Sequence, residues 1–146
     1  MIGHVTNRVM VYRMILDEIL EAKRHEITSA KARLSIDELK RRARRRSVPH
    51  RFRDALTQAA SRPALIAELK RRSPSAGMLR ERFDPVRLAQ ELQAAGASAL
   101  SVLTDERFFG GTLDILHDVQ AFVEIPILRK DFVLEPYQIY EAAVHQ

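Results

Sequence analysis

Two short apolar runs of the chain end in charged side chains. In the run of residues 64–70, Glu68 and Lys70 stand two positions apart, so on a strand they share one face while the apolar residues between them face the other. The run of residues 125–130 ends in the same way, at Lys130. A charge on the inner face of a sheet is costly unless it is paired or used. The two ends therefore predict a functional cluster, with a plain Glu–Lys ion pair as the alternative.

Two lysines and a carboxylate suit an anionic substrate and proton transfer. A lysine binds a carboxylate as a point charge, and it acts as a general acid when burial lowers its pKa. Schiff-base chemistry is open to either lysine as well. Spacing alone does not choose among these three roles for Lys70 and Lys130.

Aromatic residues and glycines lie close to the same sequence positions. Residues 105–111, DERFFGG, predict a flexible loop in which Phe109 could close over a flat ligand, and a packed surface loop is the alternative. Phe132 follows Lys130 and would extend this apolar wall or sit in the core. The five histidines show no metal-ligand spacing, so no metal site is predicted.

The elements that would position these residues alternate between strand and helix. Strands are expected at residues 64–70, 99–104 and 125–130, and helices are opened by Asp84-Pro85, Thr112 and Glu135-Pro136. Short connections imply parallel strands, in a (β/α) barrel or an open flavodoxin-like sheet. Both folds gather their chemistry at the carboxyl ends of the strands. Neither a G-x-G-x-x-G motif nor a P-loop is present.

The first 60 residues predict helices and no strand. Apolar residues at helical spacing from Tyr12 to Leu20 predict an amphipathic helix. A capping box at residues 35–38 opens a second helix, which runs toward Arg46, and a short third helix follows at residues 52–56. We expect a basic helical extension over residues 1–61 and an α/β part over residues 62–146.

Positive charge is concentrated in this helical part. Residues 1–60 hold 14 Lys/Arg against 7 Asp/Glu, whereas residues 61–146 hold 10 against 12. The run Arg41–Arg46 is the densest part, and it fits either a nucleic-acid interface or a solvated helix end. The second interpretation is preferred, because no zinc-finger spacing is present and aromatic residues make up only 6% of the chain.

Composition limits the remaining classes of protein. The 146 residues are 46% hydrophobic and 29% charged, which is typical of a globular domain and argues against disorder. The absence of cysteine excludes disulfides and Cys-based metal sites. No apolar run approaches the ~20 residues of a membrane span, and the N-terminus lacks the apolar core of a secretory signal, so the cytoplasm is the expected location.

Three motifs, in this order, resemble indole-3-glycerol phosphate synthase. They are ELKRRSPS at residues 68–75, LSVLTDERFFGG at 100–111 and PILRKDF at 126–132, continued by PYQIYEA at 136–142. Near the N-terminus, ILDEI at 15–19 followed by Lys23-Arg24 resembles the opening helix of that family. The likeness extends from about residue 12 to residue 143.

The resemblance implies an α/β fold: an N-terminal helical extension plus the first three βα units of a truncated TIM barrel. It implies a carbon–carbon lyase of tryptophan biosynthesis, which converts 1-(2-carboxyphenylamino)-1-deoxyribulose 5-phosphate into indole-3-glycerol phosphate. Ring closure, decarboxylation and dehydration proceed without cofactor or metal. The expected partner is this small anionic substrate, with its carboxylate and phosphate, and neither a membrane nor a nucleic acid.

The resemblance also implies residue roles. Lys130 would be the general acid that protonates the substrate carbonyl during ring closure. Lys70 would hold the substrate carboxylate and donate a proton in the later dehydration, while Glu68 would orient Lys70 and take part in proton transfer. The pocket for the anthranilate ring would be lined by Ser73, Pro74, Phe109 and Phe132.

A complete barrel has eight strands in about 250 residues, and three strands are found here. The family's other catalytic carboxylate and asparagine, and its phosphate site, would lie on later strands. We therefore expect residues 1–146 to be part of an enzyme and inactive alone. Three strands would leave sheet edges and the helix-facing core uncovered, which favours self-association.

Three other functions are open on the sequence. One is a different phosphate-sugar barrel enzyme, against which the Ser-Pro-Ser and Phe-Phe-Gly-Gly segments argue. Another is a nucleic-acid-binding module built on Arg41–Arg46, which salt-sensitive binding to duplex DNA would reveal. The last is a non-catalytic assembly fragment, which would form stable dimers.

Overall fold

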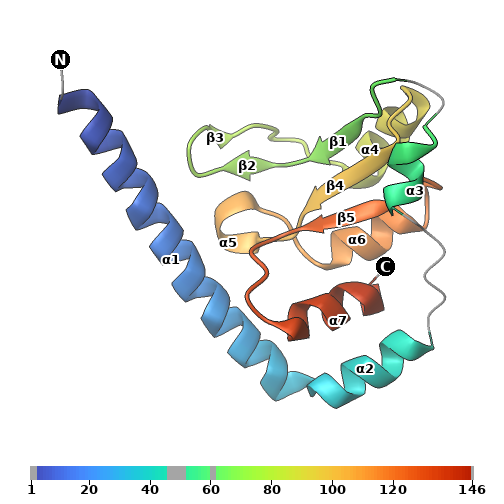
Figure 1. Ribbon diagram of the computed structural model, residues 1–146, viewed down its shortest axis with the longest axis horizontal. Helices are drawn as coiled ribbons and strands as arrows, with labels where there is room; N and C mark the ends of the chain where they lie inside the picture. The colour runs from blue at the N-terminus through green and yellow to red at the C-terminus, as the bar shows by residue number, and fades with distance from the viewer. Residues whose placement is uncertain (1–2, 46–51, 60–61, 146) are drawn as a thin grey trace.

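The structure is a computed structural model that describes residues 3–45, 52–59 and 62–145, with side chains from residue 15 onward. It contains a parallel sheet, a short hairpin and a series of helices (Figure 1). In chain order these are α1 (Gly3–Arg33), α2 (Ile36–Arg44), α3 (Phe52–Thr57), β1 (Ile66–Leu69), β2 (Arg72–Ser73), β3 (Gly77–Met78), α4 (Pro85–Ala94), β4 (Ala99–Leu103), α5 (Glu106–Phe109), α6 (Asp114–Gln120), β5 (Ile127–Lys130) and α7 (Pro136–His145).

The main sheet has three parallel strands in the order β1-β4-β5. Glu68 lies in register with Ser101, and Leu103 lies in register with Lys130. The three arrows in Figure 1 point toward the side on which α5 and α1 lie, so the carboxyl ends of the strands meet there. Strand–helix alternation and parallel pairing are confirmed, although β1 spans only Ile66–Leu69 of the run predicted at residues 64–70.

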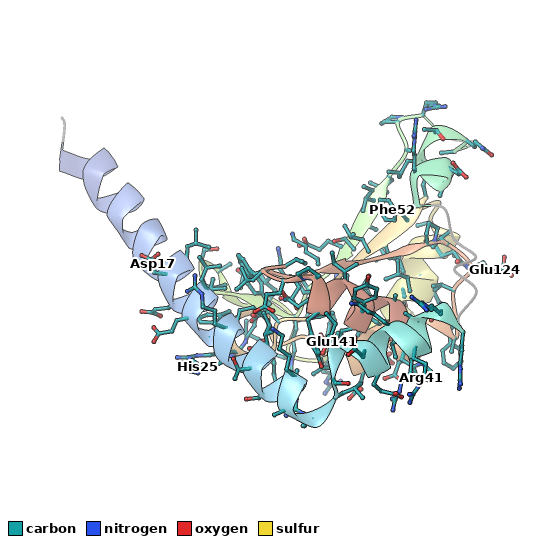
Figure 2. All side chains as sticks on the ribbon, turned by 60° about the horizontal axis from the view of Figure 1, so that its bottom comes forward. Asp17, His25, Arg41, Phe52, Glu124 and Glu141 are labelled. Carbon is teal, nitrogen blue, oxygen red and sulfur yellow. The ribbon has the colours of Figure 1, made fainter. Side chains whose placement is uncertain are left out.

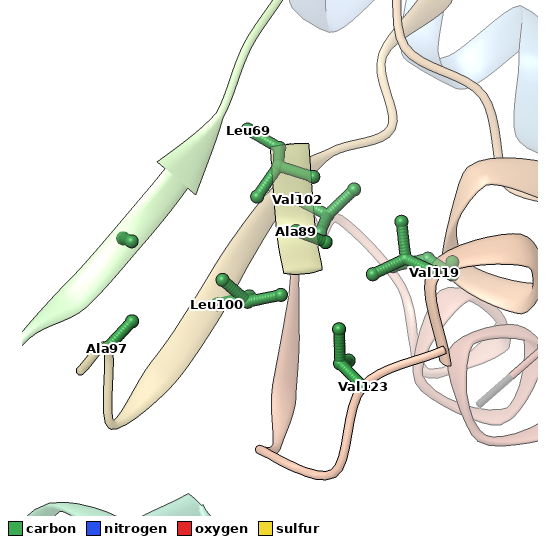
Figure 3. Packing of buried hydrophobic residues seen from close by; sticks show 9 residues of the cluster. Leu69, Ala89, Ala97, Leu100, Val102, Val119 and Val123 are labelled. Atoms are coloured by element: carbon green, nitrogen blue, oxygen red, sulfur yellow. The ribbon is translucent and has the colours of Figure 1, made fainter. Parts of the chain in front are cut away.

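Helices α4 and α6 cover one face of this sheet. Figure 3 shows Leu69, Leu100 and Val102 of the strands packing with Ala89 of α4 and Val119 of α6. All five side chains are buried. The periodicity of apolar residues in strand and helix therefore produces the expected core.

The other face of the sheet is open at its two outer strands, although every residue of the central strand β4 is buried. Ile66 and Leu128 lie on it and are 43% and 45% exposed, although both are apolar. Glu68 and Lys130 lie on the same face, since their side chains contact each other. The expectation that the helix-facing core is uncovered is wrong, because α4 and α6 bury that core; the uncovered apolar surface is on the opposite face.

Helix boundaries follow the capping signals in part. Asp84 caps α4 by accepting the N–H three residues on at 3.0 Å, and Gly96 follows the helix with a φ of +95°. The expected cap at Thr112 is wrong. Helix α6 begins at Asp114, and Leu113 before it makes no side-chain capping bond. The helix begins one residue later than a cap at Thr112 requires.

The N-terminal segment is helical, as predicted. Helix α1 is 31 residues long, yet no helix in the described ranges is long and apolar enough to cross a membrane. Ser35 caps α2 by accepting the Glu38 N–H at 3.3 Å. Helix α2 ends at Arg44, and Arg46, toward which it was expected to run, lies outside the described residues.

Helices α1 and α2 pack against α7, the last helix of the chain. A small core joins Ile27, Leu39 and Tyr137, one residue from each of these helices, and all three are buried. The Tyr137 hydroxyl donates to the Leu34 carbonyl at 3.0 Å. The helical segment is thus attached to the α/β part through buried contacts (Figure 1).

One element was not predicted, and another replaces a predicted loop. Strands β2 and β3 pair as an antiparallel hairpin after β1, and Gly77 in it has a φ of +68°. Residues 106–109 form the helical turn α5, which ends at Gly110 in a left-handed conformation. The predicted flexible loop over residues 105–111 is therefore an ordered turn in most of its length.

Candidate active site

Glu68 brings the two predicted catalytic lysines together. Its Oε1 lies 2.6 Å from the Lys70 Nζ, and its Oε2 accepts a hydrogen bond from the Lys130 Nζ. The carboxylate therefore bridges the first and last strands of the sheet in front of β4. The two ammonium groups converge on one side of the sheet, as the alternation of residues along β1 and β5 requires.

The two lysines favour the ionised form of the Glu68 carboxylate. Partial burial acts to raise the pKa of Glu68, but hydrogen bonds and positive charge from Lys130 and Lys70 outweigh it and hold that pKa below its ordinary value. With one anion and two cations, the cluster has an excess of positive charge. This arrangement can bind a substrate carboxylate and place an ammonium proton beside a carbonyl oxygen.

The predicted aromatic residues also meet. The ring centroids of Phe109 and Phe132 lie 6.3 Å apart with an interplanar angle of 40°. Phe109 is the last residue of α5, and Phe132 follows β5 by two residues, so neighbouring strands bring the rings together at the carboxyl edge. Both rings are half-buried, which leaves part of their surface available to a flat ligand.

Ser73 and Pro74 lie in the hairpin after β1. The Ser73 Oγ accepts the Ala76 N–H at 3.2 Å, so its hydroxyl shapes the turn, and Pro74 is exposed. The side chain of Arg72 attaches the hairpin to α5 by donating to the carbonyls of Glu106, at 3.2 Å, and Arg107. The hairpin is thereby fixed beside the turn that ends in Phe109.

Sequence reasoning missed a buried ionic cluster behind this edge. Lys23 of α1 is only 3% exposed in its side chain and lies 3.0 Å from Asp105 and 2.9 Å from Asp131. A signal was present: Lys23 stands four residues after Ile19 and four before Ile27, both buried, so it belongs to the buried stripe of α1. A lysine on an apolar stripe indicates a buried anion across from it.

A cavity of about 430 Å³ lies beside this cluster, between α1 and the chain that follows β4 and β5. Its lining includes Thr104, Arg129 and Glu141 but none of the predicted site residues. Arg129 already donates to Glu141 at 2.9 Å and to the Thr104 Oγ1 at 3.2 Å. The polar groups of this cavity already bind one another, so the cavity is not the candidate site. The candidate site is the open sheet face. No cluster of three or more metal-ligating side chains occurs in the described ranges.

Comparison with known proteins identifies the family of the chain. The family model of indole-3-glycerol phosphate synthase matches residues 16–146. The indole-3-glycerol phosphate synthase of Acaryochloris marina (strain MBIC 11017) is 48% identical over 130 residues, which cover 89% of this chain and 43% of that protein. The one of Rippkaea orientalis (strain PCC 8801 / RF-1) is 46% identical over 130 residues, or 89% of this chain and 44% of that protein. The chain spans less than half the length of these relatives, and it belongs to the indole-3-glycerol phosphate synthase family.

Proposed function

We propose that residues 1–146 carry the first part of the catalytic site of an indole-3-glycerol phosphate synthase, acting in tryptophan biosynthesis in the cytoplasm without cofactor or metal. The substrate is 1-(2-carboxyphenylamino)-1-deoxyribulose 5-phosphate, and the steps are ring closure, decarboxylation and dehydration. The observation that carries the proposal is the bridge from Glu68 to both lysines at the carboxyl ends of β1 and β5. Family membership supplies the reaction.

The proposed roles follow from this bridge. Lys130 gives a proton to the substrate carbonyl oxygen as the ring closes, and Lys70 holds the substrate carboxylate until it leaves as carbon dioxide. Lys70 then donates the proton with which the hydroxyl departs as water. Glu68 orients Lys70 in the resting site and takes part in these proton transfers. Ser73, Pro74, Phe109 and Phe132 hold the aromatic ring.

The proposal extends to the fold. We propose that β1, β4 and β5 are the first three strands of a (β/α)8 barrel over residues 62–146, with residues 1–61 as a helical extension. The parallel order supports this, and so does the open face, because Ile66 and Leu128 would point into the barrel interior. Barrels of this type bind phosphate after strands seven and eight. Residues 1–146 are therefore expected to have no turnover alone.

The nucleic-acid alternative is not favoured. Arg41 and Arg42 both pair with Glu38 in their own helix, and Arg41 lies at the outer surface of α2 (Figure 2). The helix turns its buried Leu39 toward α7. The arginines of the run up to Arg45, the last that the structure describes, are thus exposed on a packed helix, in agreement with the preferred interpretation of the sequence.

The proposal is tested by extending the chain with the C-terminal remainder of the Acaryochloris marina relative. We expect the extended protein to turn over the carboxyphenylamino substrate, with formation of indole-3-glycerol phosphate followed by absorbance. Lys130→Met in it should reduce kcat by about a thousandfold, as loss of a general acid predicts. A folded extended protein without turnover, beside an active relative, would refute the activity, whereas turnover by residues 1–146 alone would refute the need for later strands.

A further inference from the structure

The buried ammonium of Lys23 has three carboxylate partners. Its Nζ lies 2.5 Å from Glu26 on the same helix, 3.0 Å from Asp105 and 2.9 Å from Asp131. The contact with Glu26 is a hydrogen bond, and the two aspartates lie within ion-pair distance of the same ammonium. The two aspartates are 1% exposed in their side chains, and they follow β4 and β5. One side chain of α1 therefore joins two loops at the carboxyl edge of the sheet.

Asp131 lies between Lys130 and Phe132, and both of its carboxylate oxygens are engaged. Its Oδ1 accepts the Phe132 N–H at 2.8 Å in addition to the Lys23 ammonium. Its Oδ2 accepts the Thr104 hydroxyl at 2.8 Å and Arg129 at 2.9 Å. Burial alone raises the pKa of Asp131, but Lys23 and these donors keep it below its ordinary value, so the group is an anion. The anion fixes the backbone on which Lys130 and Phe132 stand.

Asp105 fixes the start of α5 in a similar way. Its Oδ1 caps that helix by accepting the Phe108 N–H at 2.7 Å. Its Oδ2 has no well-aligned hydrogen-bond donor in the described part of the chain, although it lies 3.0 Å from the Lys23 Nζ. The attraction of that ammonium is thus what offsets the burial of this oxygen. Because Phe109 ends α5, the position of its ring depends on the same contact.

Removal of the Lys23 charge would affect the two loops unequally. Asp131 would retain Arg129 as a cation, whereas Asp105 has no second basic partner in the ion pairs of the described residues. Two anions would then lie buried near each other, and a buried charge without a partner is strongly unfavourable. We expect the 105–111 segment to move first and Phe109 to leave Phe132.

We propose that Lys23 is a positioning residue: by pairing with Asp105 and Asp131 at once, it makes the docking of α1 a condition for the placement of Phe109, Lys130 and Phe132. This inference rests on the proposed function for its catalytic consequence. Its structural part does not depend on that function, which allows the two to be tested apart.

The first test uses residues 1–146 and amide hydrogen exchange. Lys23→Met should exchange about tenfold faster in residues 105–111 and less strongly faster in residues 130–134, where Arg129 still pairs with Asp131, while β4 retains its protection. Lys23→Arg, which keeps the charge, should retain most of the protection that Lys23→Met loses in these two segments. Lys31→Met is the matched control, because Lys31 also joins α1 to a carboxylate, Glu135, but in an exposed pair. Equal protection of both segments in Lys23→Met and Lys31→Met would overturn the proposal, as would uniform loss over the whole chain.

The second test uses the extended protein described above. Lys23→Met should lower kcat by about a hundredfold, since small displacements of catalytic groups have effects of this size, and it should raise KM, because Phe109 and Phe132 hold the aromatic ring. Lys23→Arg should recover at least half of that loss on a logarithmic scale, and Lys31→Met should retain kcat. Unchanged kcat in Lys23→Met would refute the positioning role. An extended protein that is inactive before any substitution would count against the proposed function, and hydrogen exchange would then decide on Lys23.

Discussion

At the scale of single residues, Glu68 is the group on which the arrangement of both lysines depends. Its place could be predicted, because side chains two apart on a strand share a face and both strand ends are charged. The partnership of Lys23 could not be predicted in the same way. Its aspartates lie more than 80 positions along the chain, and helical spacing shows only that the lysine is buried.

Substitution of Lys130 should change the titration of Glu68. Lys130→Met removes one hydrogen bond and one positive charge while burial persists, so the pKa of Glu68 should rise toward its ordinary value. A carboxyl with a lowered pKa in the folded chain stabilises it above the unfolded pKa, and this contribution is lost as the pH falls through the folded value. The acid dependence of stability should therefore be weaker in the variant. ¹³C NMR of the Glu68 carboxyl measures this, with Lys31→Met as control; identical titration in Lys130→Met and the parent would contradict it.

At the scale of elements, the sequence predicts most of those that are long enough to show periodicity or that begin with a capping residue. The strands and the helix after Asp84 show periodicity or a capping residue, and the structure has them. The hairpin of β2 and β3 has two residues in each strand, too few for any alternation to appear. The turn α5 was missed because its two glycines indicate a loop, although Asp105 before it is a capping residue.

The contact between β4 and the end of α5 requires glycine at position 111. A Cβ on Gly111 would lie 2.0 Å from the Leu103 carbonyl oxygen, so the backbone of one element would have to move. We expect Gly111→Ala to lower the free energy of unfolding by about 3 kcal/mol. Gly77→Ala is the control: no atom lies within 4 Å of its Cβ, and its φ of +68° should cost about 1 kcal/mol. Urea unfolding compares the two, and a loss in Gly111→Ala no larger than in Gly77→Ala would show that α5 is not held this closely.

At the scale of the whole molecule, the helices cover only one face of the sheet. One face is buried under α4 and α6, and the other carries the charged cluster together with exposed apolar side chains. The outer edges of β1 and β5 have no partner strand in the described sheet. Local sequence patterns predict each βα unit, but they cannot show which surface covers the second face. In the barrel proposed above, that surface would come from units far apart in the sequence.

Residues 1–146 should therefore associate with themselves through the open face. Free sheet edges and exposed Ile66 and Leu128 favour contact between copies, and apolar area is worth about 25 cal/mol per Å² when it is buried. Sedimentation equilibrium should give an average mass that rises above 16.7 kDa with concentration. Leu128→Gln should shift the distribution toward the monomer. Ile139→Gln is the matched control, because Ile139 is more exposed, at 61%, but lies on α7 outside the sheet. If both variants reduced association equally, general hydrophobicity would be the cause, and a parent that stayed monomeric at every concentration would show that the open face does not bind another copy.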